Sequence, residues 1–249
     1  RSDLSRAKYL LESGAKVYAS IAPSHIGYFK GVGIAKLAGA LKKLGFTGVS
    51  ETALGAQLVS AETAELLKQA GPGVYFSSAC PAAVDYLRKY YPDWTAGILP
   101  VVSPVMAHCK MLKQTYGNDI ETIFVGPCAA KKNEADRHPD VLSLAITFAA
   151  LESWFQEAGI RFSEVEEAAP VPSPAEEGRV YSVEGGMNDT LRDPSVEARL
   201  VAVSGLPNIS RLIERVDLES LRKSNTKIFV EMLACDGGCV NGPIMEQDG

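Results

Sequence analysis

The sequence predicts an α/β fold in which mostly parallel sheets are flanked by helices. Short runs rich in β-branched residues alternate along the chain with longer segments of helical period. The 249 residues are 46% apolar and 22% charged, an ordinary globular composition that is enough for one large core or two smaller ones. We therefore expect a single domain, residues 1–249, which can divide into two lobes at about 1–120 and 121–249.

The first half of the chain alternates strands and helices. Residues 15–20 read as a strand that ends in the turn-like segment 22–24 (Ala-Pro-Ser). Residues 34–44 carry apolar side chains at spacings of three and four, which predicts a helix with one buried stripe, and Gly45 ends it. The same patterns then predict strands at 46–50 and 74–78 and helices at 59–70 and 82–91.

The second half continues this alternation after a helical stretch at 106–116. The segment 164–178 is acidic and rich in proline, so we expect an extended surface connection there, which can separate the two lobes. No internal repeat interrupts the pattern. Further strands are predicted at 121–126, 179–183, 200–205 and 227–233.

Charge and hydropathy exclude two classes of partner. The 25 basic and 30 acidic residues leave a net charge of −5, so the chain lacks the basic surface that binds nucleic acid. No apolar run approaches the roughly 20 residues of a membrane-spanning helix, so we expect no membrane partner. The amino terminus has no secretory-signal pattern, and we expect a cytoplasmic protein.

The five cysteines are too few and too scattered for a disulfide framework, which favours metal ligands or catalytic thiols. Cys80, Cys128 and Cys235 each follow a predicted strand, at the edge where parallel sheets bind ligands. Cys239 follows Cys235 after a pair of glycines that allows a tight turn. Four thiolates at one centre indicate zinc or an iron–sulfur cluster.

The spacing favours iron, because structural zinc sites normally use two close cysteine pairs and here only Cys235 and Cys239 are close. Spacing alone leaves zinc as a less favoured alternative. Each cysteine can also be a small buried hydrophobe, but Cys80 and Cys128 adjoin prolines and are typical of loops. Cys109 lies in the helical stretch, and we expect it to pack in the core.

A lysine follows one of these candidate ligands closely. Lys131 comes three residues after Cys128, a spacing that would turn its ammonium group back toward the thiols. There it can offset the negative charge of a thiolate cluster or bind an anionic ligand. The alternative is a solvated helix face, which Glu134 and Arg137 fit.

Three motifs together resemble the signatures of one family, in the family's order. They are FSSACP (76–81), GPCAAKKNEADR (126–137) and EMLACDGGCVNG (231–242). By these motifs the sequence resembles the catalytic domain of the [FeFe]-hydrogenases, the iron-only hydrogenase large subunit, from about residue 15 to 243.

The resemblance implies an H-cluster between the two lobes. This cofactor is a [4Fe-4S] cube joined through one thiolate to a two-iron subcluster that carries CO, cyanide and a bridging dithiolate. The family positions imply that Cys239 is the bridge. The residues implied to hold the cube are Cys80, Cys128, Cys235 and Cys239.

The resemblance also implies contacts to the two-iron unit. Ala22, Pro23 and Ser24 match the positions that contact one cyanide, and Lys131 matches the residue that pairs with the other. A buried lysine and hydroxyl or amide donors are suitable partners for negative charge in a dry pocket.

The sequence departs from the family pattern where protons are relayed. Ala79 stands where active members have a proton-transferring cysteine, and a methyl group cannot relay a proton. Pro100 stands near the usual position of a relay serine. Glu62 and Glu65 lie in the region of the family's acidic relay, although two exposed helix carboxylates explain them equally well.

The resemblance therefore favours a hydrogenase domain with slow turnover, similar to sensory hydrogenases, which would exchange H2 and protons and report to an electron-transfer or signalling partner. One alternative is a non-catalytic [4Fe-4S] protein that resembles the hydrogenase-like proteins of cluster assembly. A third hypothesis is a fully active enzyme with another proton route, through Glu62, His108 or Cys109. The five cysteines cannot also hold accessory ferredoxin-type clusters, each of which takes four thiolates.

Overall fold

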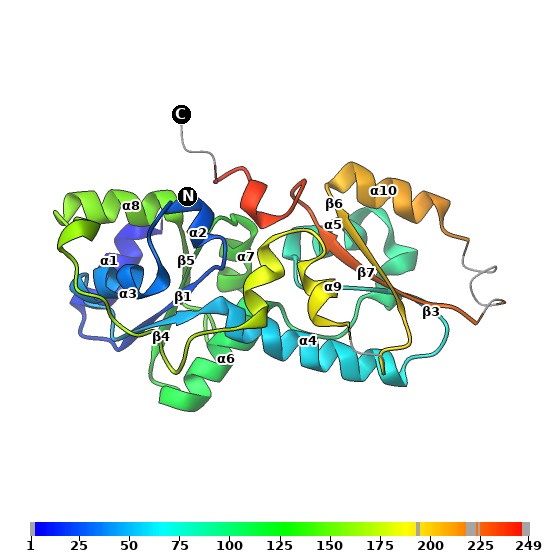
Figure 1. Ribbon diagram of the computed structural model, residues 1–249, viewed down its shortest axis with the longest axis horizontal. Coiled ribbons are helices and arrows are strands. Elements are labelled where there is room, and N and C mark those ends of the chain that lie inside the picture. Colours follow the sequence, from blue (N-terminus) through cyan, green and yellow to red (C-terminus); the bar gives the residue numbers. More distant parts are fainter. Residues whose placement is uncertain (1–2, 193–194, 218–222, 224, 246–249) are drawn as a thin grey trace.

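Two parallel sheets form the framework of the protein in this computed structural model, which describes residues 3–192, 195–217, 223 and 225–245 (Figure 1). The first sheet has the strand order β2-β1-β4-β5 and the second sheet the order β3-β7-β6. Every neighbouring pair of strands is parallel. The α/β fold with parallel sheets flanked by helices is therefore confirmed. The strands are β1 (Val17–Ile21), β2 (Gly48–Glu51), β3 (Gly73–Phe76), β4 (Glu121–Gly126), β5 (Leu144–Thr147), β6 (Arg199–Ser204) and β7 (Lys227–Leu233).

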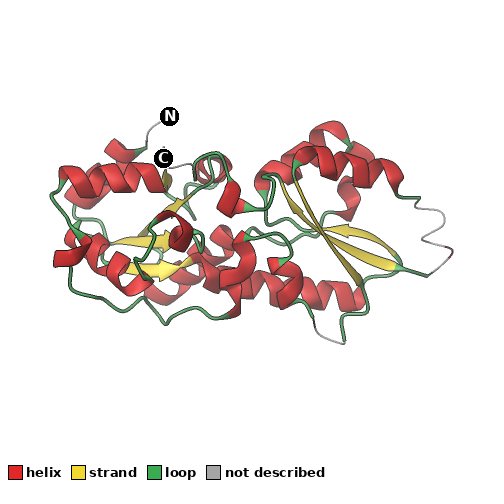
Figure 2. Ribbon diagram, turned by 45° about the horizontal axis from the view of Figure 1, so that its top comes forward, coloured by secondary structure: helices red, strands yellow, loops and turns green. Residues whose placement is uncertain are grey.

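Helices surround each sheet, and the two lobes lie side by side along the long axis of the molecule (Figures 1 and 2). Helix α4 runs along the lower side of Figure 1 from the first sheet toward the second and packs on α6. The helices are α1 (Leu4–Glu12), α2 (His25–Tyr28), α3 (Ile34–Lys43), α4 (Thr52–Gln69), α5 (Pro81–Tyr90), α6 (Pro104–Tyr116), α7 (Ala130–Arg137), α8 (Phe148–Glu157), α9 (Gly186–Thr190) and α10 (Leu206–Arg215). Short 3₁₀ helices are η1 (Pro92–Gly97), η2 (Phe162–Glu164), η3 (Glu177–Ser182) and η4 (Cys239–Asn241).

The sheets do not divide the chain at residue 120, contrary to the expected lobe boundary. Strand β3 from the first half pairs with β7 in the second sheet, whereas β4 and β5 from the second half complete the first sheet. Helix α4 follows β2 directly and carries the chain across to β3. The expected single domain, 1–249, begins and ends in segments that lie outside the described residues.

The Pro-rich segment 164–178 is a surface connection, as expected, but it is held against the first lobe. The backbone N–H of Val171 donates to the carbonyl of Val49 in β2. Buried Glu51 accepts a hydrogen bond from the backbone of Ala175 and forms a bidentate ion pair with Arg179 at 2.8 Å. The segment therefore belongs to the first lobe and is not a free linker between lobes.

Most predicted elements are present within a few residues of their expected bounds. The strand predicted at 179–183 is wrong, because this segment is the 3₁₀ helix η3. Side-chain contacts hold it: Arg179 pairs with Glu51, and the Tyr181 hydroxyl bonds to Ser60. Strand β5 was not predicted from the sequence. Among the described helices, none combines the length and the apolar character needed to cross a membrane.

Candidate metal centre

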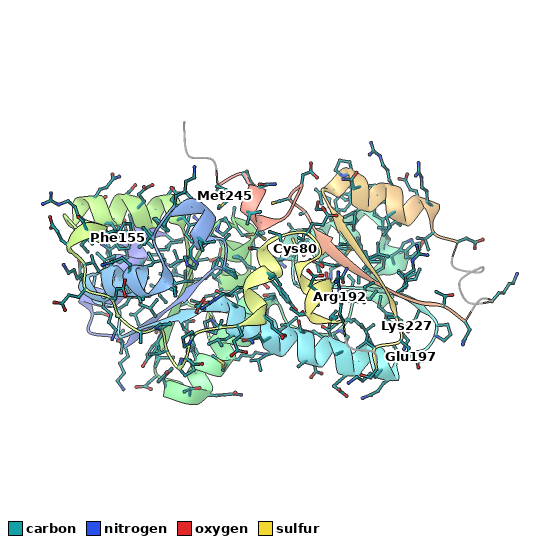
Figure 3. All side chains as sticks on the ribbon, viewed as in Figure 1. Cys80, Phe155, Arg192, Glu197, Lys227 and Met245 are labelled. Carbon is teal, nitrogen blue, oxygen red and sulfur yellow. The ribbon has the colours of Figure 1, made fainter. Side chains whose placement is uncertain are left out.

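The carboxyl ends of strands from both sheets meet at one pocket. The first sheet contributes the segments after β1, β2 and β4, and the second sheet those after β3 and β7. Figure 3 labels Cys80, which lies between the two lobes. This pocket has a volume of about 90 Å³ and is almost entirely apolar apart from its thiols and a few polar groups. The candidate residues that line it are Ala22, Pro23, Ser24, Ala79, Cys80, Cys128, Lys131 and Cys239.

A second pocket of about 150 Å³ adjoins the first. Its lining includes all four thiols that the sequence analysis assigned to one centre, together with small residues. Three of these thiols also line the first pocket, whereas Cys235 lines only the second. The structure thus brings together four cysteines that are separated by up to 159 positions in the chain, from Cys80 to Cys239.

Local structure explains how each thiol reaches the pockets. Cys80 is the residue before α5, and Pro81 occupies the first helical position, for which its fixed φ is suited. The loop between Cys235 and Cys239 turns through Gly237 and Gly238, whose φ angles are +73° and +100°. A Cβ on Gly238 would lie 2.6 Å from the carbonyl oxygen of Ser182, so this turn requires glycine.

The thiols share one electrostatic environment. Burial raises the pKa of Cys239, and the thiols of Cys80, Cys128 and Cys235 raise it further. Burial raises the pKa of Cys235 as well, again with contributions from Cys128 and Cys80. Each of the four thiols therefore lies within electrostatic reach of the other three, and cations are needed for all of them to become thiolates.

Two kinds of group near Cys128 favour a negative charge on its sulfur. Burial raises the pKa of its thiol, but the ammonium group of Lys131 and hydrogen bonds from the backbone N–H groups of Lys131 and Ala130 act in the opposite direction. These N–H groups belong to the first turn of α7. A thiolate at this helix start is stabilised by unsatisfied backbone donors.

The arrangement does not fit a mononuclear metal site. Within the described part of the chain, no three His, Cys, Asp or Glu side chains come together as ligands of a single metal ion. Zinc sites of four thiolates require all sulfurs at about 2.3 Å from one ion. In a [4Fe-4S] cube each thiolate binds a different iron, so the sulfurs lie further apart. The described thiols are therefore not arranged as a ready-made zinc site.

Cys109 lies apart from this centre. It is fully buried in α6 and belongs to the core of the first lobe. Burial raises its pKa to about 12, so it stays a neutral thiol at physiological pH. The expectation that Cys109 packs in the core is confirmed.

The segment after β1 presents an unsatisfied hydroxyl to the first pocket. Ser24 is 1% exposed, and its Oγ has no hydrogen-bond partner among the described residues. A buried hydroxyl without a partner costs about 1–3 kcal/mol, which a ligand that accepts its proton would recover. Ala22 is also buried, and Pro23 completes the wall.

Lys131 is 8% exposed and lines the same pocket. Its Nζ lies 2.5 Å from a carboxylate oxygen of Glu134 and 3.4 Å from the carbonyl oxygen of Ala79. The alternative of a solvated helix face is wrong for this residue. Lys132, by contrast, does not line the pocket, and its Nζ lies 3.7 Å from Oδ2 of Asp3.

The residues at the expected proton-relay positions are scattered. Ala79 lines the first pocket, but Pro100 is exposed in a different cleft. Glu62 is exposed on α4, and Glu65 forms an exposed ion pair with Lys68 at 2.8 Å. The structure therefore does not connect Glu62 or Pro100 with the pocket that Ala79 lines.

The sequence analysis named His108 but missed the buried polar network that surrounds it beside the pocket. Thr52 lines the pocket and bonds to Ser20, whose Oγ lies 2.7 Å from Nδ1 of His108. Nε2 of His108 lies 2.7 Å from Oγ of Ser50. His108, Ser20 and Ser50 are 0% exposed, and burial lowers the pKa of His108 to about 3. The sequence analysis named His108 as one candidate proton route, but its partners were signalled only by isolated hydroxyl residues in otherwise apolar strands.

Comparison with known protein families gives one match over most of the chain. The family described as "Iron only hydrogenase large subunit, C-terminal domain" matches residues 15–243. Iron hydrogenase 1 of Clostridium pasteurianum is 25% identical over 304 residues, which covers 97% of this chain and 52% of the relative. The periplasmic [Fe] hydrogenase large subunit of Nitratidesulfovibrio vulgaris is 25% identical, with 84% and 62% covered. The chain thus spans about half to three fifths of the length of these relatives.

Solved structures share the fold. A variant of the [FeFe]-hydrogenase of Chlamydomonas reinhardtii superposes with a TM-score of 0.75 at 22% identity, over 100% of this chain and 85% of the relative. Another solved [FeFe]-hydrogenase, with a TM-score of 0.76 at 22% identity and the same coverage, is described by its H cluster and the 2Fe subcluster of that cluster.

Proposed function

This chain belongs to the family of iron-only hydrogenase large subunits, C-terminal domain, and from that premise we propose that it is the H-cluster domain of an [FeFe]-hydrogenase that acts on H2 and protons. When bound, the H-cluster supplies the redox chemistry that interconverts H2 with protons and electrons. The protein supplies thiolate ligands, a dry pocket and polar contacts to the ligands of iron.

The observation that carries this proposal is the composition of the first pocket. It combines thiols, a buried lysine and a buried hydroxyl without a partner in an otherwise apolar cavity. Such a lining fits a metal group that needs thiolate ligands on one side and hydrogen-bond donors for anionic diatomic ligands on the other. The residues present therefore fit the H-cluster.

We assign the [4Fe-4S] cube to the four thiols of the second pocket. Cys239 borders both pockets, as a thiolate that joins the cube to the two-iron subcluster must do. Cys80 and Cys128 also line both pockets, so the bridging role of Cys239 rests on the match of its position to the family motif, whereas Cys235 lines only the second pocket. Lys131 offsets part of the negative charge of the cube and its thiolates.

We assign the two-iron subcluster to the first pocket. The Ser24 hydroxyl would donate to one cyanide beside Ala22 and Pro23, and the Lys131 ammonium group would pair with the other, since all four residues line this pocket. The Glu134 carboxylate forms an ion pair with the Lys131 ammonium group at 2.5 Å, where both side chains are mostly buried. Both donors would gain a partner when the cofactor binds.

We propose that turnover is slow and that the protein senses H2. Ala79 has no proton to pass at the position next to the pocket, so H2 can bind and change the redox state while protons leave slowly. The output would go to an electron-transfer or signalling domain or protein. The five cysteines are unpaired, which suits a reducing compartment such as the cytoplasm.

The test is an anaerobic infrared spectrum of the protein after maturation, because CO and cyanide bound to iron absorb where protein does not. We expect bands of both ligands that change on exposure to H2. A protein that holds a [4Fe-4S] cluster but never shows these bands would contradict the proposal and favour the non-catalytic cluster protein.

A further inference from the structure

A chain of three hydroxyl groups leads from the first pocket toward the protein surface. Tyr181, in η3, lines the first pocket, and its hydroxyl oxygen lies 2.5 Å from Oγ of Ser60 in α4. Ser60 Oγ lies 2.5 Å from Oγ1 of Thr190 in α9. The three residues come from segments far apart in the sequence, and the chain of hydrogen bonds is continuous.

The outer end of this chain opens into a different pocket. Ser60 and Thr190 line a surface pocket of about 340 Å³, which Glu65 and Glu177 also line. Both carboxylates belong to exposed residues. They can accept protons that arrive at Thr190, either directly or through solvent in the pocket.

The hydrogen bonds of the chain have a fixed direction. Thr190 Oγ1 donates its proton to the carbonyl oxygen of Met187 at 2.7 Å. Each hydroxyl has a single proton, so Ser60 donates to Thr190 and Tyr181 donates to Ser60. The protons of Tyr181 and Ser60 therefore point away from the first pocket, whereas the proton of Thr190 is held by the backbone of buried Met187.

We propose that Tyr181, Ser60 and Thr190 form a proton relay between the pocket beside Ala79 and the surface pocket at Glu65 and Glu177. The inference rests on the proposed function only in that protons are produced and consumed in the first pocket. In the outward direction, Tyr181 gains one proton from the pocket and passes its own proton to Ser60. Ser60 passes a proton to Thr190, and Thr190 rotates its own hydroxyl proton away from the Met187 carbonyl and releases it to the surface pocket. One proton enters, one leaves, no electron moves, and rotation of the hydroxyls restores the starting state.

The residues of the relay are protected from solvent where a relay needs protection. Tyr181 is 8% exposed and Ser60 is 7% exposed, while Thr190 at the outer end is half-buried. Burial raises the pKa of Tyr181 and outweighs the opposite effect of Ser60 and Thr190, so the phenol stays protonated at physiological pH. Tyr181 thus acts as a neutral hydroxyl in the chain.

The network around His108 does not offer an equivalent route. It also starts at the first pocket, at Thr52, but it ends at Ser50, a fully buried residue of β2. Ser20, His108 and Ser50 have no exposed surface. A proton that entered this network could not leave at its far end, whereas the chain through Ser60 reaches a solvent-exposed pocket.

The alternative is that these hydroxyl groups only hold α4, α9 and η3 together. The rate at which the Tyr181 hydroxyl proton exchanges with water distinguishes the two roles. The rate is measured by NMR in the protein as purified, with tyrosine labelled at the ring carbon that carries the hydroxyl. Because the relay is the path to solvent, Thr190→Val should slow this exchange about tenfold or more. Thr190→Ser keeps the hydroxyl and should stay near the wild-type rate. An unchanged or faster exchange in Thr190→Val would overturn the relay, because loss of a purely structural contact would expose the Tyr181 hydroxyl to water.

Tyr86 provides an internal control in the same spectra. Its hydroxyl forms a comparable bond, 2.6 Å from Oγ of Ser210, in the second lobe and away from the relay. Its exchange rate should be the same in wild type and in both Thr190 variants. Slower exchange at Tyr86 as well would indicate a global effect and would also overturn the proposal.

A second measurement follows the matured protein. After a step in pH, the infrared bands of CO bound to iron report how fast protons enter or leave the pocket. Tyr181→Phe and Ser60→Ala should slow this change about tenfold or more with the initial band positions unchanged. An unchanged rate would overturn the relay. Absence of the bands in the wild type would instead contradict the proposed function, and the hydroxyl exchange would still decide the relay.

Discussion

The two sheet edges that face each other across the pocket differ in the chemistry they contribute. The second sheet supplies three of the four thiols, from the loops after β3 and β7. The first sheet supplies a single thiol, Cys128, and with it the buried polar groups of Ser24 and Lys131. One edge is suited to hold an iron–sulfur cube, and the other to hold ligands that carry negative charge. Neither edge alone supplies all the residues that we assign to the site.

The largest effect is expected from removing the only thiol that the first sheet contributes to the pocket. Cys128→Ala should lose nearly all bound iron, because a cube corner loses its ligand and the remaining three thiols come from one side. Iron and sulfide per chain measure this directly. Cys109→Ala is the matched control, since Cys109 is equally a cysteine of the first lobe but lies in the core. If Cys128→Ala retains its iron, the first sheet does not supply a required cluster ligand.

The next largest effect separates the cube from the two-iron unit. Lys131→Ala should keep the visible absorption of the [4Fe-4S] cluster but lose the infrared bands of CO and cyanide, because the negative ligands lose their buried cation. Lys132→Ala, one position further along and directed away from the pocket, should change neither signal. If Lys131→Ala keeps both signals, the first sheet does not carry the polar role assigned to it.

A smaller effect, on the rate of H2 evolution, is expected from changing Ala79, which follows β3 of the second sheet and has no proton to donate. Ala79→Cys adds a thiol to the first pocket and should raise the rate of H2 evolution about tenfold or more, because a proton donor would then stand beside the metal. The double variant with Pro100→Ser tests whether a hydroxyl further out adds to this gain. A wild type that already turns over as fast as a cysteine-bearing relative would contradict the idea that proton transfer is limiting.

The smallest effect concerns the dry network behind the first sheet edge. His108 is neutral in the folded protein, with a pKa of about 3, whereas in the unfolded chain it has the ordinary value of 6.5. The unfolded state therefore binds more protons as the pH falls below 6.5, and stability decreases from there toward pH 3. The slope is up to about 1.4 kcal/mol per pH unit.

Urea unfolding as a function of pH measures this slope. His108→Gln should unfold more easily at neutral pH but should lose this part of the pH dependence. If the free energy of unfolding changes with pH equally in the variant and the wild type, His108 is not a neutral group buried in the folded protein.

The sequence by itself determined the local elements and the identity of the candidate ligands. Periodicity indicated where strands and helices lie, because a helix or strand depends mainly on neighbours a few residues away. The glycines at 237 and 238 indicated the tight turn between two cysteines, since positive φ is a property of the residue type. Motifs in a fixed order indicated the family, because residue identity and spacing along the chain are enough to recognise them.

Tertiary structure alone decided how these parts combine. It assigned β3 to the second sheet, folded 177–182 into a 3₁₀ helix instead of a strand, and left the hydroxyl of Ser24 buried without a partner. It also aligned Tyr181, Ser60 and Thr190 into one chain of hydrogen bonds. The physical reason is that strand pairing, burial and side-chain hydrogen bonds depend on residues distant in sequence, which no local pattern encodes.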